Sequence, residues 1–214
     1  MQFGDATAAE RTQRSHLDVA LNAFDAALDG LINTIETGAL EHLNAAEKIS
    51  FWQRFETSRN RLPLIDHALI ADAEATDLAG QRCFSSLAML LSRTLQLSPA
   101  EAAARVRAAA AVGPRTSELG EVVEPVLPHL AAAQRAGEVS TEQVQIVARA
   151  MQKLDRPDLN PEAVTAAEQQ LVKHAQQLSP KDLRLVADRI VAAVDLDGPA
   201  PVDEQSARPP ASGT

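Results

Sequence analysis

Residues 97–112, LSPAEAAARVRAAAAV, carry a complete signal for the start and body of a helix. Ser98 can accept a hydrogen bond at the N-cap, Pro99 suits the first helical position, and Glu101 stands where it would complete a capping box. Alanine, which has the highest helix propensity, makes up half of the stretch, and a Gly-Pro pair follows it. We therefore expect a helix over residues 99–112.

Similar start signals recur on both sides of this stretch. Upstream, Ser85 or Ser86 can cap a short helix that ends at Leu95. Downstream, three further capping residues precede runs in which apolar side chains return every three or four positions, the period of an amphipathic helix. These caps are Ser140, Asn160 and Ser179. The C-terminal half therefore predicts a bundle of shorter, well-capped helices.

The N-terminal third contains two longer apolar stripes. The first ends at Thr37-Gly38, because glycine readily adopts the left-handed conformation found at helix C-termini. A second helix is expected from near Glu41, with Pro63 kinking or dividing it. Since each stripe could bury the other, we expect an antiparallel hairpin. The stripes comprise Leu17, Leu21, Phe24, Leu28, Leu31 and Ile35, then Trp52, Phe55, Leu62, Ile65 and Leu69.

Composition agrees with an all-α fold class. Aromatic residues make up 3% of the 214 residues and Tyr is absent, whereas strands favour aromatic and β-branched side chains. We expect a long-helix hairpin over residues 1–80, a domain of shorter helices over residues 81–198, and a disordered tail over residues 199–214. The tail is rich in Pro, Ala and Ser and lacks apolar periodicity.

Charge points to one candidate binding surface. The chain has a formal net charge of −9, but residues 82–115 hold five arginines against Glu101 alone, which gives +4. The two helices that meet at residues 96–98 match the spacing of a DNA-binding helix-turn-helix. We expect DNA contact through Arg93, Arg105, Arg107 and Arg115, although these arginines could also form a solvated face. Arg105 and Arg107 stand two positions apart, so both cannot point squarely at one groove.

Catalytic and metal-binding patterns are missing from the sequence. The five histidines stand singly, Cys83 is the one cysteine, and neither a Gly-rich phosphate loop nor a nucleophile elbow is present. We therefore expect no catalytic residues, no cofactor and no metal. The first residues lack the apolar core of a secretory signal, and no apolar run approaches the ~20 residues that cross a bilayer. A cytoplasmic protein without a membrane role is expected.

Several motifs, in this order, resemble the family called domain of unknown function 222, or the 13E12 repeat family of mycobacteria and related actinobacteria. Coverage is roughly residues 20–198. The motifs are LSPAEAAARVR at 97–107, Gly120-Glu121, Pro125 to Pro128, AAAQRAGEVS at 131–140, Ala167-Glu168, LSPKDL at 178–183 and Asp195-Leu196-Asp197-Gly198.

The resemblance implies a helical protein, and many family members carry an HNH nuclease domain after the Asp-x-Asp-Gly segment. Here sixteen residues without His follow Gly198, so the metal-binding histidines of an HNH motif have no matching positions. Leu196 also stands where the family often has Pro. No catalytic residue is carried over from the family.

We therefore expect a non-catalytic helical module that binds DNA or is accessory to a nuclease. The alternative is a protein-interaction element in which the stripe from Leu17 to Ile35 pairs with a second copy. A more remote alternative is a remnant of an HNH endonuclease, or an enzyme that uses carboxylates alone.

Overall fold

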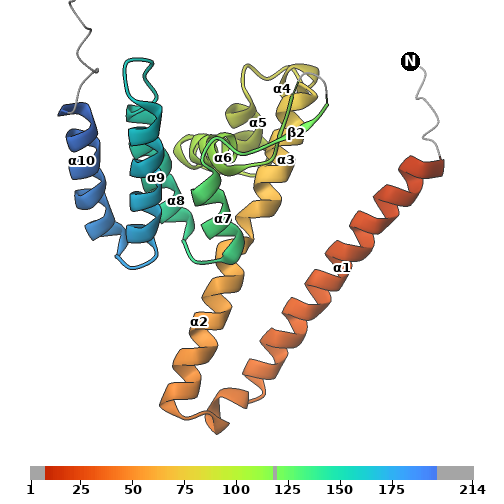
Figure 1. The fold of residues 1–214 in the computed structure, drawn as a ribbon. Helices are drawn as coiled ribbons and strands as arrows, with labels where there is room; N and C mark the ends of the chain where they lie inside the picture. The colour runs from red at the N-terminus through yellow and green to blue at the C-terminus, as the bar shows by residue number, and fades with distance from the viewer. Residues whose placement is uncertain (1–7, 118–119, 197–214) are drawn as a thin grey trace, which may run out of the picture. The chain divides into compact units, whose positions relative to one another are not determined.

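The computed structural model describes residues 8–117 and 120–196 (Figure 1). The expected all-α class is confirmed, since the described strands are one two-residue pair, β1 (Arg115–Thr116) and β2 (Val122–Val123), in antiparallel register. The expected disordered tail lies outside the described residues. The helices are α1 (Ala8–Glu36), the 3-10 helix η1 (Ala39–His42), α2 (Ala45–Arg61), α3 (Pro63–Ala75), α4 (Leu78–Gln81), α5 (Leu87–Thr94), α6 (Pro99–Val112), α7 (Pro128–Ala136), α8 (Thr141–Lys153), α9 (Pro161–Ala175) and α10 (Pro180–Leu196).

The chain divides into two compact units, Met1–Arg54 and Phe55–Thr214. In the second unit, α3 packs against α6. Ile70 and Ala73 of α3 form one apolar cluster with Ala109 of α6 and with Leu87 and Leu90 of α5. The residues after Arg54 therefore belong with the helices that follow them.

The first unit keeps its apolar stripe in solvent. In α1, Leu17 is 74% exposed, Leu21 60% and Phe24 45%. The pairing of this stripe with the second stripe in a hairpin stays a prediction. Gly38, with φ of 94°, ends this segment as expected.

The second long helix begins later than expected and is divided as expected. It starts at Ala45, not near Glu41, because Asn44 and Glu47 form a reciprocal cap in which each backbone N–H donates to the other's side chain. Pro63, which has no N–H to donate, separates α2 from α3.

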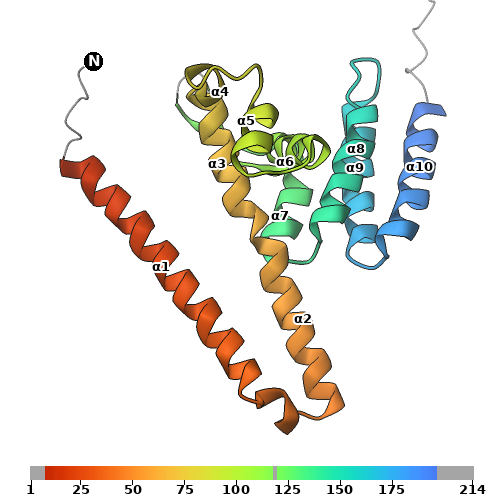
Figure 2. The same cartoon turned by 180° about the vertical axis from the view of Figure 1, so that it is seen from behind.

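Helix α6 is shared by both apolar clusters of the second unit. Ala109 belongs to the cluster formed with α3 and α5, while Ala108 and Val112 belong to the larger core of α7–α10. Both views of the ribbon show α6 lying among these helices (Figure 2). The side chains buried most completely in the larger core include Leu130, Leu154, Leu171 and Leu183.

The caps read from the sequence are present, with one exception. Ser86, Ser98 and Ser140 each accept a hydrogen bond from the backbone N–H three residues on, and Asn160 accepts one from Glu162. Glu101 does not complete the box expected at Ser98, because its carboxylate instead pairs with Arg105. A full capping box forms at α8, where the Gln143 side chain accepts from the backbone of Ser140.

Two hydrogen bonds that involve buried polar side chains connect helices of the second unit. Glu168 of α9, 3% exposed, accepts a hydrogen bond from the Leu130 N–H in the first turn of α7, a helix without a local side-chain cap. Between α3 and α7, Nε2 of buried His67 lies 3.1 Å from Oε1 of Gln134. Burial lowers the pKa of His67, against the hydrogen bond that the ring makes to Gln134 Oε1 and the charge of Asp66, so the imidazole is neutral at pH 7.

We expect Glu168→Gln to keep the acceptor oxygen for Leu130 and Glu168→Ala to lose it. Alanine leaves a buried N–H unpaired, which should lower the free energy of unfolding by about 1–3 kcal/mol.

Burial raises the pKa of Glu168, against hydrogen bonds from Leu130 and His129 and the charge of His129. Because the pKa of Glu168 is higher in the folded protein than in the unfolded chain, the folded state binds the proton more tightly. The resulting stabilisation is fully present below the pKa of the unfolded chain and is lost as the pH rises through the pKa of the folded protein.

Denaturant unfolding at several pH values checks both effects. Wild type should lose stability relative to Glu168→Gln as pH rises above 4.5, the ordinary pKa of this carboxyl. Equal losses for the Gln and Ala variants at pH 7 would contradict the capping role.

Candidate functional site

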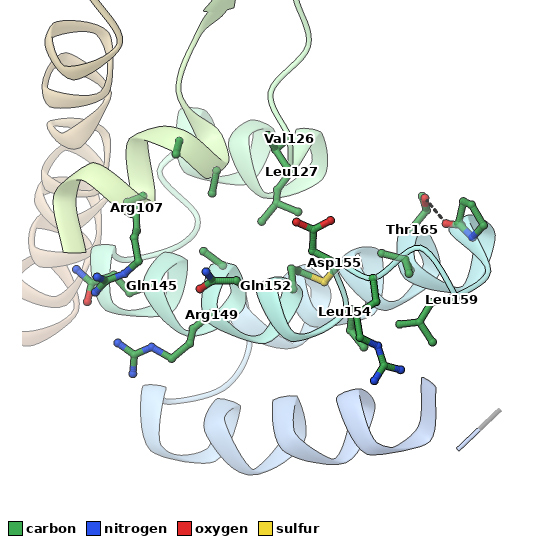
Figure 3. Close-up of a pocket in the computed structure, with 18 of the residues that line it drawn as sticks. Arg107, Val126, Leu127, Gln145, Arg149, Gln152, Leu154, Asp155, Leu159 and Thr165 are labelled. Atoms are coloured by element: carbon green, nitrogen blue, oxygen red, sulfur yellow. Dashed lines mark hydrogen bonds between the residues drawn. The ribbon is translucent and has the colours of Figure 1, made fainter. Parts of the chain in front are cut away.

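A cleft of about 610 Å³ lies between α6 and α8 and extends to the start of α9 (Figure 3). Apolar side chains supply most of its wall, and seven polar or charged residues interrupt them. The apolar residues include Ala104, Ala108 and Ala111 of α6, Val126, Leu127, Met151, Leu154, Leu159 and Val164; the polar ones are Arg107, Gln145, Arg149, Gln152, Asp155, Arg156 and Thr165.

The two arginines of α6 point in different directions. Arg107 is exposed and extends from α6 toward Gln145 of α8 (Figure 3). Arg105 faces α3, where its guanidinium lies 3.1 Å from Asp66 and 2.7 Å from Glu101. Residues two apart on a helix project about 200° from each other, so only one of them can reach the cleft.

Helix α8 supplies a polar stripe that faces the cleft. Gln145, Arg149 and Gln152 follow one another at intervals of four and three residues and therefore share a face. The opposite face is apolar, since Val147 and Ala150 are buried in the core. The capping box at Ser140 positions this stripe, because it fixes where the helix begins.

Asp155 and Arg156 close the end of the cleft beyond α8. Asp155 points toward Leu127 and Val126 (Figure 3). Leu127 is held in place by its N–H, which donates to the Ala111 carbonyl at 2.9 Å. Arg156 lies at ion-pair distance from Asp158 and Asp195, so its charge is already compensated. Arg107 and Arg149 form no ion pair with any described residue.

The four arginines expected to bind DNA do not form one surface around the helical corner. Arg107 lines the cleft, and Arg105 is held by Asp66 and Glu101. Arg93 borders a separate hollow of about 650 Å³ lined by residues 86–99. Arg115 lies in β1, with Nη1 3.5 Å from the Glu124 carbonyl.

The expected helix–turn–helix corner is present, but α6 contacts other helices on two sides. It packs on α3 and α5 and also on α7 and α8. Sequence reasoning missed Arg149, Gln145 and Gln152, the residues that share the cleft with Arg107. Their spacing on α8 was readable in the sequence, but the opposition of α8 to α6 depends on tertiary packing.

Among residues 8–117 and 120–196, no group of three His, Cys, Asp or Glu could hold a metal ion. No helix in the same part of the chain is both long and apolar enough to cross a membrane. Cys83 is exposed and has φ of 58°.

We expect Arg105→Ala to lower the free energy of unfolding by up to about 1 kcal/mol, because two partly exposed ion pairs are lost. Arg107→Ala should change it by less than about 0.5 kcal/mol, as for a surface residue without a partner. Urea titrations of both variants at low and high salt measure this difference. An Arg107 variant less stable than the Arg105 variant would contradict the assignment of the two side chains.

The fold and the cleft define an all-α helical-bundle protein with an arginine-bearing apolar cleft. The chain belongs to the family described as domain of unknown function (DUF222), whose family model matches residues 49–211. This confirms the resemblance read from the sequence motifs.

Its relatives include uncharacterized proteins of Mycobacterium tuberculosis. One is 30% identical over 188 residues, covering 86% of this chain and 40% of the relative. A second is 31% identical over 171 residues, covering 78% of this chain and 36% of the relative, and a third is 32% identical over 131 residues, covering 59% and 56%. The chain thus spans about two-fifths of the length of the first curated relatives it matches. No solved structure matches it.

Proposed function

We propose that the chain is a non-catalytic binding module whose cleft between α6 and α8 takes an acidic, partly apolar segment of a partner protein. The observation that carries this proposal is the convergence of Arg107 and Arg149, from two different helices, on one apolar cleft. Neither arginine has an ion-pair partner among the described residues, so both are available to a ligand.

The apolar wall favours a ligand with an apolar body. A cleft of about 610 Å³ falls in the size range of ligand sites, which are mostly apolar with a few convergent polar groups. The alanines of α6 leave room for a peptide chain to approach the helix closely. Burying the ligand's apolar side chains against Met151, Leu154 and Val164 would supply affinity.

The two arginines favour carboxylates on that ligand. A guanidinium binds a carboxylate through two parallel hydrogen bonds, and the bond strengthens where the apolar wall excludes water. Gln145 and Gln152 can each donate to and accept from the ligand backbone. Asp155 would disfavour a second carboxylate near Leu127, which sets the direction in which an acidic segment lies.

The residue types that line the cleft favour binding over catalysis. Its charged side chains are three arginines and Asp155. Arginine does not give up its proton in proteins, so these groups lack the pair of titratable partners that general acid–base catalysis needs.

A second candidate ligand is duplex DNA. It is favoured by the Gln145, Arg149 and Gln152 stripe, because glutamine and arginine are the side chains that pair with adenine and guanine edges. DNA binding would also suit a module accessory to a nuclease, the role that the family resemblance implies. The apolar wall gives DNA no contact, which is why a peptide is the first choice.

Selection of peptides from a random displayed library tests the first proposal. Peptides that bind the full chain should be enriched in Asp or Glu together with Leu or Phe. The charge reversal Arg107→Glu with Arg149→Glu should weaken the selected peptides by at least tenfold, about 1.4 kcal/mol. The matched control is Arg135→Glu with Arg189→Glu, two exposed arginines outside the cleft, which should bind as wild type does.

Enrichment of basic peptides, or equal binding by the two double variants, would reject the peptide proposal. Titration of labelled duplex DNA with the same proteins tests the second candidate. Binding that weakens steeply with salt and is lost in the cleft variant alone would assign the site to DNA instead.

A further inference from the structure

Helix α1 carries an apolar seam with a regular seven-residue repeat. One set of three side chains recurs every seven residues, and a second set does so four residues later. Alternating steps of four and three residues are the a and d positions of a coiled coil. The d positions are Leu17, Phe24 and Leu31, and the a positions are Leu21, Leu28 and Ile35.

The described side chains of the seam are exposed or half-buried. Leu17 is 74% exposed and Leu28 is 40% exposed, and Leu31 and Ile35 are half-buried. No described side chain of α1 from residue 15 onward is fully buried. A continuous apolar stripe of this kind is uncommon on monomeric proteins and marks an interaction surface.

The residues that flank the seam favour one relative direction of two paired helices. The e positions hold Asp18, Asp25 and Ile32, while the g positions hold Ala20, Ala27 and Thr34. In a parallel pair each e position faces the g position five residues earlier on the other helix, so Asp25 meets Ala20. In an antiparallel pair e faces e, and aspartates would approach one another.

We propose that two copies of this chain associate through α1 as a parallel two-stranded coiled coil over Leu17–Ile35. The seam is apolar at all six positions, so it is complementary to itself. The flanking g positions carry no charge, so they offer no opposite charge to select a different helix as partner. Three heptads of seam extend about 28 Å along the helix axis.

Pairing would also explain how α1 stays helical. Isolated helices gain little stability in water, and most helical stability in proteins comes from packing an apolar face. Within one copy that face is largely exposed, so the second copy supplies the packing. This inference uses no cleft residue and is independent of the proposed function.

Sedimentation equilibrium of the full chain over a concentration series tests the proposal. Wild type should be a dimer that dissociates on dilution, and Leu21→Glu with Leu28→Glu, which places charges at two a positions, should be monomeric. Asn22→Glu with Asn33→Glu adds the same two charges on the outer face of α1 and should stay dimeric. A monomeric wild type at every concentration, or a dimer that survives the seam substitutions, would overturn the proposal.

A cysteine cross-link tests the direction of pairing and does not depend on disrupting α1. In a Cys83→Ser background, which removes the exposed native thiol, Leu17→Cys should form a disulfide between copies under mild oxidation. Parallel helices bring the two d positions at residue 17 together, whereas antiparallel helices separate them by the length of the seam. A dimer without this cross-link would refute the parallel arrangement.

Discussion

The close packing of α6 against helices on two sides is the interaction on which the structure of the second unit depends. Alanine at 102, 108 and 109 is buried, and its small side chain lets α3 and α5 approach one face while α7 and α8 approach another. Well-packed interiors leave no room for larger groups at such positions. Ala104 and Ala111 of the same helix line the cleft, so this helix both forms the core and shapes the site.

This packing separates two neighbouring arginines into different roles. Arg105 joins α6 to Asp66 of α3, while Arg107 reaches the cleft, where Arg149 of α8 contributes a second cation. An apolar cleft with two cations suits an acidic, partly apolar ligand. The apolar seam of α1, whose described side chains are exposed or half-buried, is a second candidate surface. We propose that both surfaces bind other macromolecules.

Local features of the fold could be predicted from the sequence, and long-range ones could not. Caps at Ser86, Ser98 and Ser140 were readable because a cap is a hydrogen bond between residues three apart. The all-α class followed from composition and period. Glu168 capping α7 and Arg149 facing Arg107 join residues about forty apart. Sequence periodicity indicates which face of a helix is buried, but not which helix covers it.

The two faces of α6 can be compared directly by placing a larger side chain on each. Ala109→Leu enters the packed cluster with α3 and α5 and should lower the free energy of unfolding by about 1–3 kcal/mol, the usual cost of overpacking. Ala104→Leu points into the cleft and should leave stability within about 0.5 kcal/mol of wild type. Denaturant unfolding of the two variants measures the difference. Equal destabilisation by both, or a larger loss from Ala104→Leu, would contradict the assignment of a packed face and an open face to α6.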